Sequence, residues 1–152
     1  MTDLFSDASL GEDVLKNAIT ELVEYNATIT AGEGLNIESI NSAGQAVVGV
    51  ATTGEKAQFV AMFDGVDGDF KEAMAYGLTK VTFGGAVTAG AAVKSGATGK
   101  FVAAVRTVTV AAGTTGASGA LTVEAGIACG TSYSVGTTND TGLIMFMGGI
   151  LP

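Results

Sequence analysis

Residues 84–105, GGAVTAGAAVKSGATGKFVAAV, restrict the fold more than any other part of the chain. Small or branched apolar residues fill two short stretches, and residues 95–99 between them supply the small, glycine-bearing sequence SGATG that a tight turn needs. The segment therefore predicts a β-hairpin. A chain built from such hairpins is expected to be a small all-β domain that acts through its surfaces.

A fainter copy of this segment lies upstream. Residues 29–32 (ITAG) match residues 87–90 (VTAG). Residues 42–48 (SAGQAVV) match residues 96–102 (GATGKFV). The two matches predict that hairpin units of one kind recur along the chain.

The N-terminal residues follow a different pattern. Residues 9–12 (SLGE) have the spacing of a capping box, and the apolar residues after them fall on one helical face, which predicts a short helix over residues 11–24. The alternative is an arm that becomes ordered only against a neighbour. We therefore divide the chain into an N-terminal arm with a short helix, residues 1–27, and a single all-β domain, residues 28–152. For that domain we expect a small antiparallel β-barrel or β-sandwich.

Alternating apolar and polar residues predict further strand pairs. Residues 70–78 (FKEAMAYGL) have partly helical spacing but are few, so they are interpreted either as a single helical turn or as a loop that connects strands. The expected pairs are residues 46–50 with 58–63, 105–111 with 120–123, and 132–135 with 142–147.

Charge is scarce and unevenly distributed. Only 14% of the residues are charged, against about a quarter in typical globular domains, while 47% are hydrophobic. The net charge is −8, and residues 1–40 hold eight carboxylates and one lysine. No basic stripe is present to bind phosphates, and no apolar run approaches the length of a membrane helix. At the start of the sequence no basic segment precedes an apolar one, so we expect no signal peptide. We therefore expect neither nucleic acid nor membrane as a partner.

Catalytic chemistry is poorly supported. The chain has no histidine, the side chain best suited to proton transfer near neutral pH. Cys129 is the single cysteine, flanked by Ala128 and Gly130, and is expected to be a small buried apolar residue. The acidic loop of residues 64–69 (DGVDGD) lacks the alternate carboxylate spacing of an EF-hand and is interpreted as an ordinary acidic loop, with a bound cation as the alternative. We expect a protein that is not an enzyme and that needs no cofactor or metal.

The ordered set of glycine-bearing segments resembles the small capsid cement, or head decoration, proteins of tailed bacteriophages. The resemblance covers about residues 28–149 and does not account for the residues before it. Residues 106–122 also depart from the pattern and look like an additional hairpin. The segments that carry the resemblance are residues 46–51 with 58–63, residues 84–105, and residues 126–130 with 141–147.

This resemblance implies a virion structural protein, made in the bacterial host cytoplasm, that binds the outer surface of the assembled phage capsid. There it would stabilise contacts between major capsid protein subunits, and it would be a homotrimer. The alternative is another phage structural subunit, such as a tail-tube or fibre-forming protein. We expect residues 1–10 to reach onto a neighbouring subunit and two loops to lie exposed. The residues concerned are Leu4, Phe5 and Leu10 as anchors, and Asp64, Asp67, Asp69, Thr114 and Thr115 in the loops.

Overall fold

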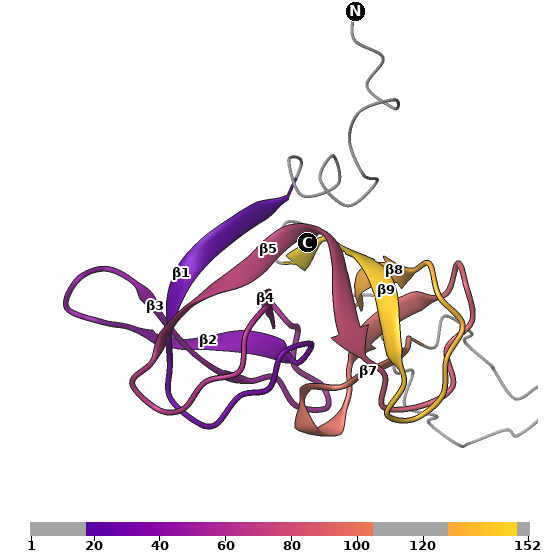
Figure 1. The fold of residues 1–152 in the computed structure, drawn as a ribbon, viewed down its shortest axis with the longest axis horizontal. Helices are drawn as coiled ribbons and strands as arrows, with labels where there is room; N and C mark the ends of the chain where they lie inside the picture. Colours follow the sequence, from indigo (N-terminus) through magenta and orange to yellow (C-terminus); the bar gives the residue numbers. More distant parts are fainter. Residues whose placement is uncertain (1–17, 105–127, 149–152) are drawn as a thin grey trace, which may run out of the picture.

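The computed structural model describes residues 18–104 and 128–148. Within these ranges the chain is mainly β, which confirms the expected fold class (Figure 1). A short 3-10 turn, η1 (Ala97–Gly99), is also present. The strands are β1 (Ile19–Tyr25), β2 (Gly34–Ile40), β3 (Ala46–Val50), β4 (Phe59–Ala61), β5 (Phe70–Thr82), β6 (Ala92–Ser95), β7 (Phe101–Ala103), β8 (Ala128–Ser132) and β9 (Thr141–Phe146).

Five strand segments close into a barrel, which we call barrel 1. β3 pairs with β1 in parallel and with β2 antiparallel, and β4 pairs antiparallel with both β2 and β5. The N-terminal half of β5, from Phe70 to Tyr76, pairs with β1 and completes the ring. All the strand edges used in this ring are thereby hydrogen-bonded to a neighbour within it.

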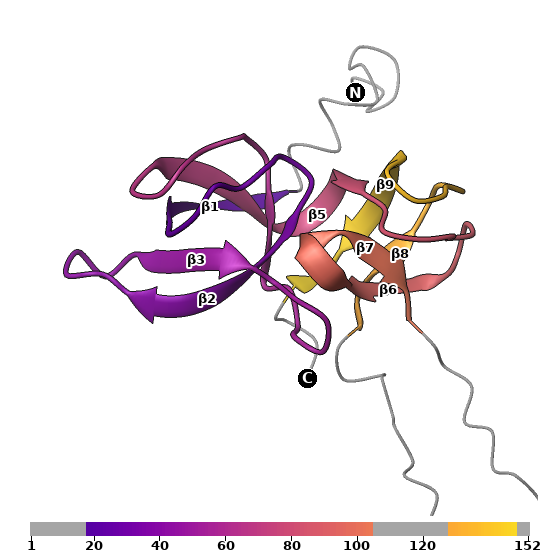
Figure 2. The ribbon, with the colours of Figure 1, turned by 90° about the horizontal axis from the view of Figure 1, so that it is seen from below.

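The C-terminal half of β5 begins a second group of strands, which we call barrel 2. From Gly77 to Thr82, β5 pairs with β9, and the order continues through β8, β6 and β7. A parallel bridge between Phe83 and Phe101 brings β7 back to the end of β5. Gly77, where the pairing changes barrel, has φ +135°, a conformation that residues with a side chain rarely adopt. The two groups lie side by side, with β5 running from one into the other (Figures 1 and 2).

The two barrels are copies of one structural unit. In barrel 1, Ile29 and Gly65 form a bridge with two backbone hydrogen bonds of 2.9 and 3.0 Å. In barrel 2, Val87 and Gly136 form the same bridge, again with bonds of 2.9 and 3.0 Å. The strand pairings correspond throughout, because β1 to β5 of the first unit are matched by the second half of β5 and β6 to β9. The match between ITAG and VTAG is therefore confirmed as part of a tandem repeat.

The second sequence match is out of register by one residue. Tyr25 pairs in parallel with Val48, and Phe83, its equivalent, pairs in parallel with Phe101. Val48, and not Val47, is thus the structural counterpart of Phe101. The difference matters because a shift of one residue moves a strand's side chains to the opposite face.

Each barrel has its own apolar core, and the two cores correspond. The cluster in barrel 1 and the cluster in barrel 2 contain six pairs of residues at matching positions, all buried. The burial of these side chains is the main favourable contribution to the stability of each barrel. The pairs are Val23 and Val81, Tyr25 and Phe83, Ile29 and Val87, Leu35 and Val93, Val48 and Phe101, and Ala73 and Ile144.

The joint between the barrels is apolar and closely packed. Val60 and Met74 belong to barrel 1 but are buried in the core cluster of barrel 2, together with Ala51 and Ala57. The buried Ser95 hydroxyl of barrel 2 donates a hydrogen bond of 3.1 Å to the carbonyl of Ala51. The shared core and this hydrogen bond fix one barrel on the other.

The expected helix over residues 11–24 is wrong from Ile19 onward, where the chain forms β1; residues 11–17 lie outside the described ranges. Ile19, Thr20 and Val23 are β-branched and favour a strand. Pairing with β5 along the whole of β1 satisfies backbone groups that a helix would have bonded internally. Barrel 1 thus includes residues that the sequence analysis placed in the N-terminal arm.

Two further expectations in the first half of the chain are wrong. Residues 70–78 are neither a helical turn nor a loop but lie within β5, the central strand of the molecule. Residues 46–50 do not pair with residues 58–63, because β2 lies between β3 and β4. The connection between β3 and β4 therefore does not form a hairpin.

The expected hairpin in residues 84–105 is confirmed, with β6 and β7 paired across η1. The pairing of residues 132–135 with 142–147 is confirmed for the strands themselves, but β8 begins and ends earlier, so that Gly130 lies opposite Phe146. Cys129 is fully buried, as predicted. The pair formed by residues 105–111 and 120–123 lies outside the described residues.

Candidate interaction surface

The acidic loop of barrel 1 and a loop of barrel 2 have the same turn. The Asp69 carboxylate accepts the backbone N–H of Val66 at 3.1 Å. In barrel 2 the Asp140 carboxylate accepts the backbone N–H and the hydroxyl of Thr137, at 2.7 and 3.0 Å. These backbone and side-chain bonds lower the pKa of Asp140 below its usual value. Both carboxylates therefore hold the turns closed.

The three predicted loop carboxylates lie together but have different surroundings. Asp64 and Asp67 are exposed, and Asp69 is half-buried. Asp64 accepts the backbone N–H of Ala31 at 2.8 Å, and Asp69 lies 3.7 Å from the Lys71 ammonium. Two of the three carboxylates thus brace the loop. No group of three or more His, Cys, Asp or Glu side chains in the described ranges is arranged to hold a metal ion.

The other predicted site residues are Leu4, Phe5, Leu10, Thr114 and Thr115, and all of them lie outside the described residues. Contacts of the N-terminal arm with a neighbouring subunit therefore stay a prediction. The same is true of the exposed loop that contains Thr114 and Thr115.

Tyr25 contacts the acidic loop through both its hydroxyl and its ring. Its hydroxyl donates a hydrogen bond of 3.0 Å to the carbonyl of Phe63, and its ring lies against Gly65, where a Cβ atom would be only 2.8 Å from the ring. Burial, followed by the negative charges of Asp64 and Asp69, raises the pKa of Tyr25 to about 12. Tyr25 is therefore neutral and acts as a hydrogen-bond donor at physiological pH.

The two barrels differ strongly in charge. Residues 18–76, which form barrel 1, contain nine Asp or Glu and two Lys residues, a net charge of −7. The described residues of barrel 2, 77–104 and 128–148, contain three Lys and one Asp, a net charge of +2. The sequence alone shows that acidic residues concentrate near the N-terminus, but the boundary between the two charged regions lies within β5, where no sequence feature marks it.

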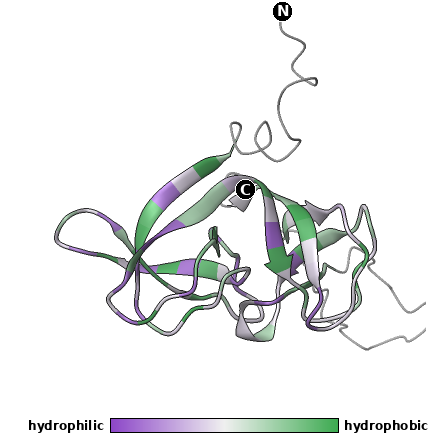
Figure 3. Ribbon diagram, in the orientation of Figure 1, coloured by the Kyte–Doolittle hydropathy of each residue, from purple (hydrophilic) through white to green (hydrophobic). Residues whose placement is uncertain are grey.

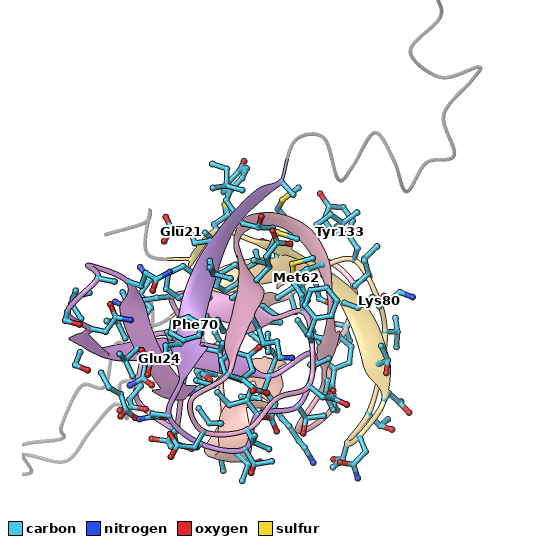
Figure 4. All side chains as sticks on the ribbon, turned by 60° about the vertical axis from the view of Figure 1, so that its left-hand side comes forward. Glu21, Glu24, Met62, Phe70, Lys80 and Tyr133 are labelled. Carbon is cyan, nitrogen blue, oxygen red and sulfur yellow. The ribbon has the colours of Figure 1, made fainter. Side chains whose placement is uncertain are left out.

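The outer face of barrel 1 combines apolar and acidic side chains. Leu22 on β1 lies directly opposite Glu72 on β5, and Phe70 lies on the same face two residues earlier. Leu22 is 49% exposed and Phe70 50% exposed. Glu24, labelled in Figure 4, lies on the same face of β1 two residues after Leu22, and β1 shows apolar and polar bands in Figure 3.

The outer face of barrel 2 combines apolar and basic side chains at the matching place. Lys80 on β5 lies opposite Leu143 on β9, and the backbone N–H of Tyr133 bonds to the carbonyl of Leu143 at 2.8 Å. Tyr133 is 60% exposed, and Val135 nearby is 75% exposed. Figure 4 shows Lys80 and Tyr133 at the surface, with Met62 between them and Phe70 of barrel 1 in that view.

The single thiol is unsuited to nucleophilic chemistry. Cys129 is buried, and its thiol donates to the carbonyl of Val93 at 3.6 Å. Burial raises the pKa of Cys129 to about 12, so the thiolate is not formed near neutral pH.

The described part of the chain contains no helix with the length and hydrophobicity of a membrane span.

These features define a mainly β protein with a closed five-stranded barrel and a second, corresponding group of strands, and the described residues of the two carry opposite net charges. Its fold is similar to that of a phage head fibre protein: the crystal structure of the head fibre gp8.5 N base in bacteriophage phi29 matches with a TM-score of 0.61. The match covers 85% of this chain and 93% of the other, at 13% sequence identity, and shows a shared fold. The sequence itself matches no family model and no curated protein.

Proposed function

We propose that this protein is a structural component of a phage virion, bound to the outer surface of the head, where it stabilises contacts between major capsid protein subunits. The observation that supports the proposal most strongly is the fold that it shares with a phage head fibre base over most of both chains. The sequence resemblance to capsid cement proteins points in the same direction.

The surfaces of the described residues suit a binding role. Large apolar side chains are exposed on both barrels, and exposed apolar patches commonly mark protein interaction sites. The chain has no histidine, and its single cysteine is buried with a raised pKa. We accordingly propose that the protein is not an enzyme and that it needs no cofactor.

The mechanism that we propose is linked binding to an assembled shell. A homotrimer carries three copies of each binding surface, and several weak contacts that act together hold more strongly than one. Because such a protein binds the assembled shell and not its separate subunits, mass action shifts the equilibrium towards the shell.

A second candidate is the base of a fibre, since the matching structure is itself the base of a head fibre. Such a protein would sit on the head and carry a further appendage. A cement protein should cover many equivalent positions on the shell, whereas a fibre base should occur in few copies and be found with its fibre.

The test is to locate the chain on particles of the phage that encodes it. We expect purified chain to co-sediment with expanded empty heads, and antibodies against it to label the outer surface of virions in electron micrographs. Heads should bind the chain without residues 1–10 less well if the N-terminal arm contributes. Label confined to tails, or no label on particles, would refute the proposal.

A further inference from the structure

The two barrels present matching rows of surface residues that carry opposite charges. In barrel 1, Leu22 on β1 lies opposite Glu72 on β5. Met62 comes directly after the last residue of β4, and that residue pairs with the neighbour of Glu72 on β5. In barrel 2 the corresponding row is Lys80, Leu143 and Tyr133. The two rows occupy the same place in the repeated unit. Glu72 of barrel 1 corresponds to the apolar Leu143 of barrel 2, and the apolar Leu22 of barrel 1 corresponds to Lys80.

Neither charged side chain is paired with another charge in the part of the chain that the structure describes. Across the described residues, the side chains of Glu72 and Lys80 make no hydrogen bond and no ion pair, and both are exposed. Each has exposed apolar area beside it, Leu22 in barrel 1 and Tyr133 in barrel 2. An apolar patch with one unpaired charge is suited to a partner that offers apolar area and the opposite charge.

We propose that the partner is a second copy of this chain, bound so that the outer face of barrel 1 in one copy contacts the outer face of barrel 2 in the next, with Glu72 opposite Lys80. The net charges of −7 and +2 favour this arrangement over the contact of two like faces. Contact between two barrel 1 faces would bring Glu24 and Glu72 of both copies together, and such like-charge contacts are strongly unfavourable.

The fold leaves both faces available at once. The joint between the barrels buries Val60 and Met74, and Met62 packs partly against it, but Leu22 and Glu72 of barrel 1 and Lys80 and Tyr133 of barrel 2 stay exposed. Each copy can therefore engage one neighbour through barrel 1 and another through barrel 2. Such a heterologous contact closes into a ring when the rotation between copies permits. The inference does not depend on the proposed role in a virion.

Charge reversal tests the contact in the full chain. We expect Lys80→Glu and Glu72→Lys each to weaken self-association about tenfold or more, measured by analytical ultracentrifugation, because each places like charges opposite one another. The double variant should recover most of the affinity, since it restores opposite charges. Lys100→Glu makes the same charge change elsewhere on barrel 2, where Lys100 bonds to Asn139, and should leave association unchanged.

Disulfide trapping tests the geometry. The native Cys129 is buried, so Glu72→Cys and Lys80→Cys each introduce the one accessible thiol. Under mild oxidation, covalent dimers should form in an equal mixture of the two variants and not in either variant alone. A wild-type chain that stays monomeric at millimolar concentration would overturn the proposal. So would single charge reversals that associate like the wild type, or dimers of Glu72→Cys alone.

Discussion

Tyr25 and Phe83 occupy the same position in the two repeats, and each donates its backbone N–H to the aspartate that closes the neighbouring turn. The bonds run to the carbonyl of Asp69 at 2.8 Å and to that of Asp140 at 2.9 Å. Both rings lie over a glycine of the turn, Gly65 in barrel 1, where the tyrosine hydroxyl also reaches the carbonyl of Phe63. Barrel 2 thus provides a natural comparison for the contribution of that hydroxyl.

The first prediction concerns Tyr25→Phe, which gives barrel 1 the aromatic residue of barrel 2. At pH 7 the variant should lose about 1 kcal/mol of unfolding free energy, because the Phe63 carbonyl loses its donor. The pKa of Tyr25 is raised from 10.0 to about 12, so the folded state binds more protons than the unfolded state between these values. Wild-type stability should therefore fall as pH rises from 10 towards 12.

Urea unfolding at pH 7 and between pH 10 and 11.5 checks this prediction. The variant should lose less stability than the wild type over the alkaline interval, so that the difference between them narrows or reverses. Tyr133→Phe is the matched control, because Tyr133 is 60% exposed and should behave like the wild type throughout. A constant difference between Tyr25→Phe and wild type at all pH values would contradict the assignment.

The second prediction concerns a glycine that an aromatic ring requires. A Cβ atom at Gly142 would overlap the ring of Phe83, whereas one at Gly85 would lie 3.8 Å from Val102. Gly142→Ala should lose about 2 kcal/mol or more of unfolding free energy through overpacking, and Gly85→Ala less than about 0.5 kcal/mol. Chemical denaturation measures both. If the clash is the cause, Phe83→Leu combined with Gly142→Ala should cost less than the sum of the two single changes.

The third prediction concerns the turn that Asp140 closes. Asp140→Ala should lower stability at pH 7, because two bonds from Thr137 are lost. The same bonds lower the pKa of Asp140 in the folded state, so their contribution is present above about pH 4 and is lost as pH falls through the folded pKa. The melting temperatures of variant and wild type should therefore converge in strong acid. Asp67→Ala, an exposed residue in the equivalent loop of barrel 1, is the control and should track the wild type.

The sequence predicts the parts of the fold that local chemistry determines. The β6–β7 hairpin follows from the turn sequence SGATG, and the burial of Cys129 follows from its small apolar neighbours. β5 escaped prediction because Ala73 faces the core of barrel 1 while the adjacent Met74 is buried in the core of barrel 2. Burial on both sides removes the alternation that marks a strand.

The same argument applies to the surface rows. Lys80 and Tyr133 are far apart in the chain, and only the pairing of both with Leu143 places them on one face. The match between ITAG and VTAG reveals the tandem repeat. The alignment of the strands that follow could not be predicted, because the loops between strands differ in length in the two repeats. If the alignment is wrong by one residue at Val48, the residue next to Val48 is assigned to the core in its place.

The last prediction concerns the coupling of the two barrels through Ser95. Its buried hydroxyl donates to the carbonyl of Ala51 in the other barrel, and Ser95→Ala should lose about 1–2 kcal/mol because that carbonyl is left without this donor. Because the barrels share part of a core, we expect them to unfold together, and amide hydrogen exchange should quicken in β2 and β4 as well as in β6 and β8. Ser39→Ala, on the exposed end of β2, should leave exchange in all four strands unchanged. Faster exchange in barrel 2 alone would show that the barrels unfold independently and that the joint does not couple them.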